Sequence, residues 1–446
     1  MYKISRYLLL FTIACSSNAC KKFLSVEPKV SIADDATIVD ETSANTAING
    51  VYNALGSSGY YAVSFPVIGY ASGDNVEYIG TLVYNNQFTS HTVRADNQTI
   101  LAVWKAAYNT INRANHVIAK VPGVSDEGFT QEERDKLLGE AHFIRSLAYF
   151  DIVRIWGGAP IVLTPTLAVV NKVGVARSTA DEVYAQVFSD LTKAETLLPN
   201  TLNRFRATKK TAWALLSRYY LYRKDWAQAE SFATRLIGDA GYRLSKPYNS
   251  FFASNVTGSV ESIFEIQYSP KFLNDNRNDW QPASNGGGRR IVPTNAFIEL
   301  VNNPLVGGNR NTILGRTSTG LWYGNLYYRS PATDPSYIIR IAELFLIRAE
   351  ARAQQNKLGL AAEDLNAVRD RAGLSVTTAA TQEQLLLAIE NENRLEFGLE
   401  PHRWFDLVRT GRAQQVLGIT DPNKLLLPIP SDEIIIDDAL KQNPGY

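Results

Sequence analysis

Apolar residues recur at helical spacing along most of this chain. The first stripe runs from Ala47 to Leu55 and stops at Gly56, and a second runs from Trp104 to Ile118. A spacing of three to four residues places such side chains on one face of a helix, where they can be buried together. The pattern therefore predicts a mainly helical protein whose helices pack through these stripes.

Local signals predict where several helices begin and end. Thr130 with Glu133 has the spacing of a capping box ahead of a long apolar stripe. That stripe stops at the segment Trp156-Gly-Gly-Ala-Pro160, where glycine can take the left-handed cap and proline cannot continue a helix. Ser178 is the predicted cap of the next helix, which ends before Pro199.

Two helical hairpins carry small residues where their helices should cross. The first joins 211–223 to 225–237, and the second joins 339–354 to 358–371. Alanines at the crossings let paired helices approach closely, which is typical of tetratricopeptide-type units; they include Ala227, Ala229, Ala233, Ala349, Ala351, Ala361 and Ala362. Such units normally repeat in tandem, whereas about a hundred residues separate these two.

Two stretches interrupt the helical pattern, at 57–98 and 238–335. Both are rich in Asn, Gly and Ser and also in Tyr, and the second contains Trp as well. Long loops in a compact domain are usually functional or disordered, and the aromatic content argues against disorder. We therefore expect one domain over 20–446, with a helical scaffold at about 40–56, 99–237 and 336–446 and with the two insertions carrying the ligand surface.

The insertions also supply the candidate ligand residues. A Tyr or Trp ring offers a flat apolar face for stacking on a sugar, while amides and carboxylates bond to hydroxyls. For any single loop aromatic, packing in the core is an equally good interpretation. The predicted ligand residues are Asp74, Asn75, Tyr78, Asn278, Trp280, Trp322 and Tyr323.

Composition narrows the classes of function. The 446 residues are 45% hydrophobic and carry a net charge of +1, so the charge gives no reason to expect a nucleic-acid partner. The chain has four histidines, which are scattered along it without paired helical spacing. We therefore expect neither a metal site built on imidazoles nor a cofactor.

Candidate catalytic groups have structural interpretations. Glu392 and Glu396 share a helix face, as a carboxylate pair for glycoside hydrolysis would. Arginines alternate with them, which favours an ion-pair network that includes Arg394 and Arg409. The glycine-rich run 286–290 lacks the pattern of a phosphate-binding loop and is interpreted as a flexible loop tip. The sequence thus predicts that the protein is not an enzyme.

The first residues have the pattern of a lipoprotein signal. A basic start and a short apolar run precede Cys15 and Cys20, the two cysteines of the chain. We expect 1–19 to be the signal peptide and Cys20 to be the site of lipid attachment, because Cys15 still belongs to the apolar run. The mature chain would then contain no other thiol.

Together these segments resemble the SusD/RagB family of outer-membrane nutrient-binding lipoproteins of Bacteroidetes. The resemblance spans nearly the whole chain, and it depends on the order and spacing of its motifs. They are CKKFLSVEP from Cys20, the helix from Trp104 to Asn115, EAHFIRSLAYFDIVRIWGGAP from Glu140, YIIRIAELFLIRAEA from Tyr337, ENRLEFGLE from Glu392, RWFDLVR from Arg403 and QNPGY from Gln442.

The resemblance implies a helical protein with tetratricopeptide-like units, tethered to the outer face of the outer membrane. It implies a partner, a TonB-dependent transporter resembling SusC, to which the protein delivers oligosaccharides or other small nutrients without catalysis. Two departures are Pro401, where the family usually has glycine, and the basic pair Lys21-Lys22 beside the anchor. The alternatives are a surface glycoside hydrolase and a tetratricopeptide-type scaffold that binds only protein.

Overall fold

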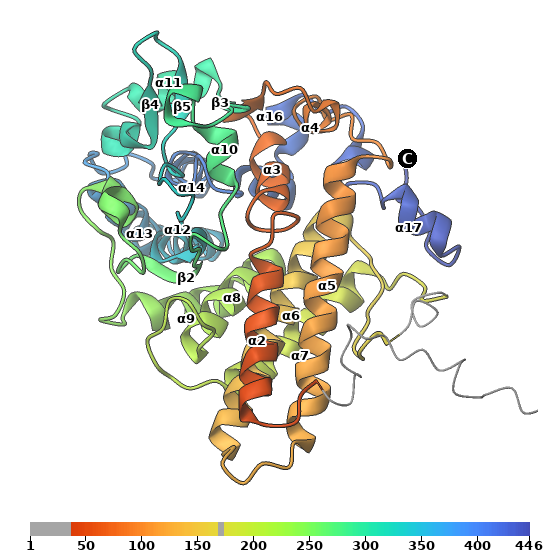
Figure 1. The fold of residues 1–446 in the computed structure, drawn as a ribbon. Coiled ribbons are helices and arrows are strands. Elements are labelled where there is room, and N and C mark those ends of the chain that lie inside the picture. Colours follow the sequence, from red (N-terminus) through yellow and green to blue (C-terminus); the bar gives the residue numbers. More distant parts are fainter. Residues whose placement is uncertain (1–36, 168–173) are drawn as a thin grey trace, which may run out of the picture.

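The computed structural model describes residues 37–167 and 174–446. Long helices form one end of the molecule, shorter paired helices form its middle, and loops with short strands form the opposite end (Figure 1). The long helices are α2 (Glu41–Leu55), α5 (Gln98–Lys120), α6 (Gln131–Trp156) and α7 (Ala180–Leu197). The paired helices are α8 (Lys209–Tyr222), α9 (Trp226–Ile237), α12 (Ile341–Gln354), α13 (Leu358–Arg371) and α14 (Gln382–Glu396).

Shorter elements fill the connections. The short helices are α3 (Ser64–Ala71), α4 (Val83–Thr89), α10 (Asn276–Trp280), α11 (Asn295–Asn302), α15 (Arg403–Arg409), α16 (Ala413–Leu417) and α17 (Ser431–Ile436). Short 3₁₀ helices are η4 (Val121–Gly123), η6 (Tyr248–Phe251), η7 (Ala253–Asn255), η8 (Ala283–Asn285), η9 (Gly308–Ile313) and η10 (Pro422–Leu425). The strands are β1 (Val76–Tyr78), β2 (Ser262–Ile266), β3 (Ile291–Pro293), β4 (Leu314–Arg316), β5 (Trp322–Gly324) and β6 (Ser336–Arg340).

Side-chain caps determine where the long helices begin. Thr130 and Glu133 form the predicted capping box at α6, and Gly157 ends that helix with a φ of 73°. The cap of α7 is Thr179 and not Ser178, because the Thr179 hydroxyl accepts from the Glu182 amide while the Glu182 carboxylate accepts from the Thr179 amide. The boundary prediction was therefore one residue early.

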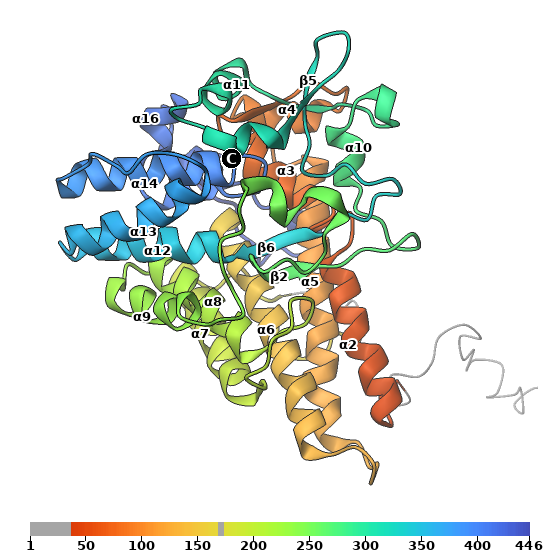
Figure 2. The same ribbon diagram turned by 90° about the vertical axis from the view of Figure 1, so that its left-hand side faces the viewer.

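The two predicted hairpins are present as the pairs α8–α9 and α12–α13. Ala229 and Ala361 are fully buried at these pairings, and the Ser217 hydroxyl donates to the Ala229 carbonyl across α8 and α9. Helix α9 also packs against α12, so the hairpins are neighbours in space although an insertion separates them (Figure 2). The second hairpin begins at Ile341, because Ile339 belongs to β6.

The insertions contain more regular structure than the sequence predicted. Three two-stranded antiparallel ladders pair β1 with β3, β2 with β6 and β4 with β5. The first of these joins the two insertions, with Val76 opposite Pro293 and Tyr78 opposite Ile291. The second fixes the longer insertion to the start of α12, with Glu265 opposite Tyr337. Segments far apart in sequence are thereby held at one end of the molecule.

The C-terminal segment returns to the end of α6. The Trp156 indole donates to the Pro428 carbonyl at 2.9 Å, and the Asn443 amide donates to the Trp156 carbonyl at 3.1 Å. Two motifs that carry the family resemblance therefore lie in contact. Within 37–167 and 174–446, no helix combines the length and the apolar character that crossing a bilayer requires.

Candidate functional site

The two insertions meet on one surface, which we call the loop face. It consists of β1 and β3, the β4–β5 hairpin and the loop 281–290. Figure 2 shows β5 and α10 close together at the end of the molecule beyond the stacked helices α12, α13 and α14. The expected convergence of the insertions is thus a feature of the fold, and it follows from the β1–β3 pairing.

Three predicted ligand residues are buried beneath this surface. Trp280 is 0% exposed and lies edge-on to Tyr70, with ring centroids 5.2 Å apart. Tyr78 is 4% exposed and Asn75 is 1% exposed. The Asn75 side chain donates to the Arg394 carbonyl at 3.1 Å and accepts from the Arg394 guanidinium at 2.8 Å. These side chains hold the loops in place and present no free face to a ligand.

The predicted polar residues Asp74 and Asn278 differ in exposure. Asp74 pairs with Arg403 at 2.7 Å and with Arg394 at 2.9 Å, so its charge is already matched. Asn278 is exposed on α10, and its carbonyl accepts from the Gly288 amide at 2.7 Å. Asn278 is therefore available to a ligand, whereas Asp74 ties the first insertion to the C-terminal helices.

Trp322 and Tyr323 are both partly exposed on β5, but they lie on opposite faces of the hairpin because successive strand residues alternate. The Tyr323 ring covers Gly315, where a Cβ would lie 2.3 Å from it, so a larger residue would displace the ring. Trp322 lies opposite Arg316, whose guanidinium carbon is 5.3 Å from the indole ring. The two aromatics do not form one continuous platform.

Sequence reasoning missed the arginines around Trp322. The glycine-rich run is a hydrogen-bonded turn between η8 and β3, in which the Arg289 amide donates to the Gln281 carbonyl at 2.8 Å. Gly287 passes so close that a Cβ would lie 2.2 Å from the Gln281 oxygen. The turn places the Arg289 guanidinium against the Trp322 carbonyl at 2.8 Å. The interpretation of the run 286–290 as a flexible loop tip did not predict this contact.

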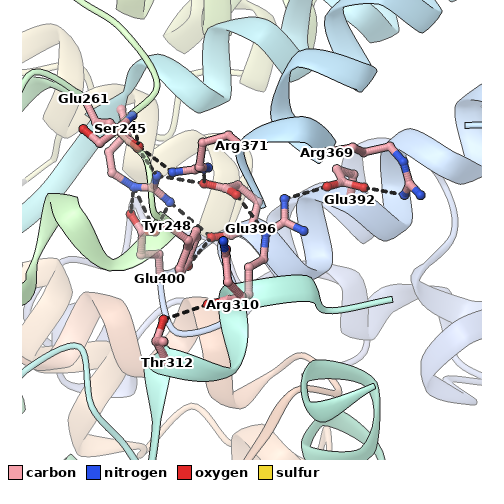
Figure 3. Close-up of polar contacts among 12 residues, drawn as sticks. Ser245, Tyr248, Glu261, Arg310, Thr312, Arg369, Arg371, Glu392, Glu396 and Glu400 are labelled. Carbon is pink, nitrogen blue, oxygen red and sulfur yellow. Dashed lines mark hydrogen bonds and ion pairs between the residues drawn. The ribbon is translucent and has the colours of Figure 1, made fainter. Parts of the chain in front are cut away.

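The candidate catalytic carboxylates belong to a buried ionic network (Figure 3). Glu392 is 1% exposed and Glu396 is 0% exposed. Arg310 contacts both, at 2.5 Å and 3.0 Å, and Arg371 also pairs with Glu396. Burial alone would raise the pKa of Glu396, but Arg371, Arg340 and Arg310 lower that pKa to about 2. Glu396 is thus held as an ionised structural group.

The other two predicted members of the network are also ion-paired. Arg394 contacts Asp74 at 2.9 Å, and Arg409 contacts Glu350 at 2.6 Å and Asp406 at 2.9 Å. A sugar would have to enter this packed interior to reach Glu392 or Glu396, so the geometry favours the structural interpretation. In the described part of the chain, no three His, Cys, Asp or Glu side chains gather closely enough to hold a metal ion.

A hollow lies elsewhere, between α5, the segment 160–167 and α17. Its volume is about 610 Å³, and its lining is mostly apolar, including Trp104, Tyr108, Pro160, Leu167, Ile436 and Leu440. None of the predicted ligand residues lines it. In Figure 1, α17 lies on the opposite side of the molecule from β4 and β5, so the hollow and the loop face are separate surfaces.

Comparison with protein families identifies two matching segments. Residues 22–221 match a profile described as "Starch-binding associating with outer membrane", and residues 322–446 match the SusD family profile. Together they cover most of the chain. The chain belongs to the SusD/RagB family.

Relatives of the SusD family match along most of their length. The chain is 24% identical to SusD-like protein P38 of Formosa agariphila, covering 99% of this chain and 98% of the relative. It is 24% identical to the starch-binding protein SusD of Bacteroides thetaiotaomicron, covering 72% of this chain and 74% of the relative. Among solved structures, a SusD superfamily protein of Bacteroides vulgatus matches with a TM-score of 0.82 at 21% identity, covering 91% of this chain and 99% of the other.

A laminarin-binding SusD-like protein also shares the fold, with a TM-score of 0.80 at 22% identity and with 92% of this chain and 100% of the other covered. These matches confirm the mainly helical, tetratricopeptide-like architecture. SusD-family membership places the protein among non-catalytic, glycan-binding proteins associated with the outer membrane.

Proposed function

We propose that this protein is a lipid-anchored receptor on the cell surface that binds an oligosaccharide at its loop face and delivers it to a TonB-dependent transporter resembling SusC. The observation that carries the proposal is the partly exposed indole of Trp322, which lies on the β4–β5 hairpin beside β3. Relatives described as starch-binding and laminarin-binding support a carbohydrate ligand.

The chemistry of the loop face suits a sugar. The indole of Trp322 offers an apolar surface for the C–H face of a pyranose ring, and neighbouring donors can bond to its hydroxyls. We assign the stacking contact to Trp322 and a polar contact to the exposed Asn278, whereas Tyr323 lies on the other face of the hairpin. Asp74, Asn75, Tyr78 and Trp280 have a supporting role, because their side chains are ion-paired or buried.

Titration calorimetry with Trp322→Ala tests the ligand site. With an oligosaccharide that the parent binds, we expect the affinity to fall about tenfold, since a stacked ring contributes about 1–2 kcal/mol. The matched control is Trp226→Ala, because Trp226 is also partly exposed but lies on α9. Equal affinity for the parent and Trp322→Ala, with folding intact, would place the site elsewhere.

The proposed lipid anchor at Cys20 lies outside the described residues. Acylation contributes about 0.8 kcal/mol per buried methylene, so several chains give stable membrane attachment. We expect Cys20→Ala to release the protein from the membrane fraction, whereas Cys15→Ala remains attached. Mass spectrometry that finds an unmodified mature start at another residue would contradict the assignment.

The transporter partner can be tested in the cell. If a gene for a transporter resembling SusC lies beside this one, we expect the two proteins to co-purify after mild solubilisation. Deletion of that transporter should abolish growth on the bound glycan while leaving the purified receptor's affinity unchanged. Normal growth without the transporter would show that delivery follows another route.

The glycosidase alternative makes a separate prediction. Because Glu392 and Glu396 are buried among arginines, the purified protein should release no reducing sugar from a glycan that it binds. Release that is abolished by Glu392→Gln, in a variant as stable as the parent, would restore the enzyme hypothesis.

A further inference from the structure

One part of the longer insertion, residues 271–330, carries an excess of positive charge. Residues 271–330 contain seven arginines and lysines but three aspartates and glutamates, although the whole chain has 45 positive and 44 negative side chains. Two of the seven are buried and ion-paired: Arg310 with Glu392 and Glu396, and Arg329 with Asp334. The remaining excess is therefore a property of the surface.

Two of these arginines contact Trp322 from different directions. Arg289 Nε donates to the Trp322 carbonyl at 2.8 Å, and Arg316 lies opposite Trp322 with its guanidinium carbon 5.3 Å from the indole ring. Arg316 Nε donates to the Gly320 carbonyl at 3.1 Å. Each guanidinium is thus oriented through Nε, which leaves its two terminal nitrogens for other partners.

Neither of these arginines has a charged partner. Among the described residues, no carboxylate lies within ion-pair distance of Arg289 or Arg316, or of Arg277, which bonds to the Asn285 and Gly286 carbonyls of the same loop. The nearby Asp279 pairs with Arg290 at 2.8 Å. The exposed carboxylate of Glu77 on β1 makes no ion pair with any described residue.

The backbone at Arg289 is also unusual. Its φ is 44°, a left-handed conformation that costs a non-glycine residue free energy and is seen most often where the surrounding structure imposes it. Here the close turn at Gly287 and the hydrogen bonds to 278–281 impose it, and the result is a guanidinium fixed at the Trp322 carbonyl. A planar guanidinium binds carboxylate and sulfate oxygens in pairs, with stronger hydrogen bonds than it makes to hydroxyls.

We infer that the loop face selects glycans that carry carboxylate or sulfate groups. This inference rests on the proposed function, since it assumes that the ligand binds at Trp322. The sugar ring stacks on the indole, and its acidic substituent pairs with Arg289 or Arg316. Neutral glycans would keep the stacking contact but would leave both guanidinium groups without a counter-charge.

Affinity electrophoresis of the full-length mature chain tests the inference. The gels contain starch or laminarin as neutral glycans, polygalacturonate or alginate as carboxylated ones, and carrageenan or fucoidan as sulfated ones. We expect retardation by at least one charged class and little by the neutral pair, and the two charged classes distinguish carboxylate from sulfate recognition. Polyglutamate, a charged polymer without sugar rings, should not retard the protein.

Single substitutions test whether Arg289 and Arg316 cause the preference for charged glycans. Arg289→Gln and Arg316→Gln should each weaken binding of the retained charged glycan about tenfold, and the effect should diminish at high ionic strength. Arg243→Gln is the matched control, because Arg243 is an exposed arginine of the same insertion outside the loop face.

The outcomes separate this inference from the proposed function. Binding of neutral glycans that depends on Trp322 but not on Arg289 or Arg316 would overturn the charge selectivity and leave the glycan site intact. Equal retardation by polyglutamate would show simple ion exchange and would also overturn it. No binding to any glycan would contradict the proposed function itself.

Discussion

Arginines inside the scaffold and arginines on the loop face are held in different ways. Arg310, Arg340 and Arg371 are fully buried, and each contacts at least two carboxylates. Arg289 and Arg316 bond through Nε to backbone carbonyls, and no carboxylate of the described residues pairs with them. An unmatched charge is very costly in a protein interior but not at a hydrated surface. The interior arginines therefore serve stability, while those of the loop face remain available for a ligand.

Breaking the interior network should have the largest effect on stability. Glu396→Ala removes a carboxylate shared by Arg310, Arg340 and Arg371, and loss of one partner of a buried ion pair costs about 3–5 kcal/mol. Urea unfolding at pH 7 measures the difference. The control is Glu383→Ala, an exposed carboxylate of the same helix. A loss below about 1 kcal/mol would contradict the structural role.

The same network predicts a dependence on pH. The arginines lower the pKa of Glu396 to about 2, while a glutamate in an unfolded chain has a pKa of about 4.3. Its charged form therefore stabilises the fold fully above about pH 4.3, and this contribution is lost as the pH falls towards 2. The stability difference between the parent and Glu396→Ala should be constant from pH 7 to pH 5 and should decrease below about pH 4.3.

Two tryptophans, Trp280 and Trp322, allow structural support of the loop face to be tested apart from ligand binding. Trp280→Ala should destabilise the protein by about 3–5 kcal/mol, because Trp280 is fully buried against Tyr70 and Gly324. Trp322→Ala should cost little stability, because its ring is partly exposed, but should lower ligand affinity. Thermal unfolding and calorimetry on both variants give the two readouts. If Trp280→Ala were as stable as the parent, the ring would not support the loop face.

The scaffold can also be tested at its helix crossings. Ala229→Phe places a large ring where α8 and α9 meet, and overpacking of this kind costs about 1–3 kcal/mol. Ala227→Phe is the control, because Ala227, which was predicted at the crossing, is exposed on the same helix. We expect a lower melting temperature only for Ala229→Phe, with ligand affinity unchanged. Equal melting of both variants would mean that α8 and α9 do not cross at Ala229.

The sequence predicted the helices of the scaffold better than the side-chain positions of the loop face, and the reason is physical. Helix periodicity and caps are local, so the helix 358–371 and the capping box at Thr130 were predicted at their observed positions. The loop face depends on pairing between distant segments, such as β1 with β3. Nothing local in the sequence shows that Trp280 is buried while Trp322 is partly exposed.

The contacts of the arginines were also difficult to predict, because they too join segments that are distant in the sequence. Alternating acid and arginine at 392–396 indicated an ion-pair network, but the observed partners of Glu392 and Glu396, such as Arg310 and Arg371, come from other elements. The run 286–290 looked like a free loop tip. Its contact with Trp322 depends on the turn at Gly287 and on the β4–β5 hairpin. Both are tertiary features that composition and spacing do not encode.

Hydrogen exchange with and without a bound oligosaccharide tests the central claim most directly, because it locates the ligand without altering the protein. We predict that peptides covering 285–290 and 314–324 exchange more slowly in the complex, while α8, α9, α12 and α13 are unaffected. Protection confined to those helices, or to the hollow between α5 and α17, would contradict the assignment of binding to the loop face.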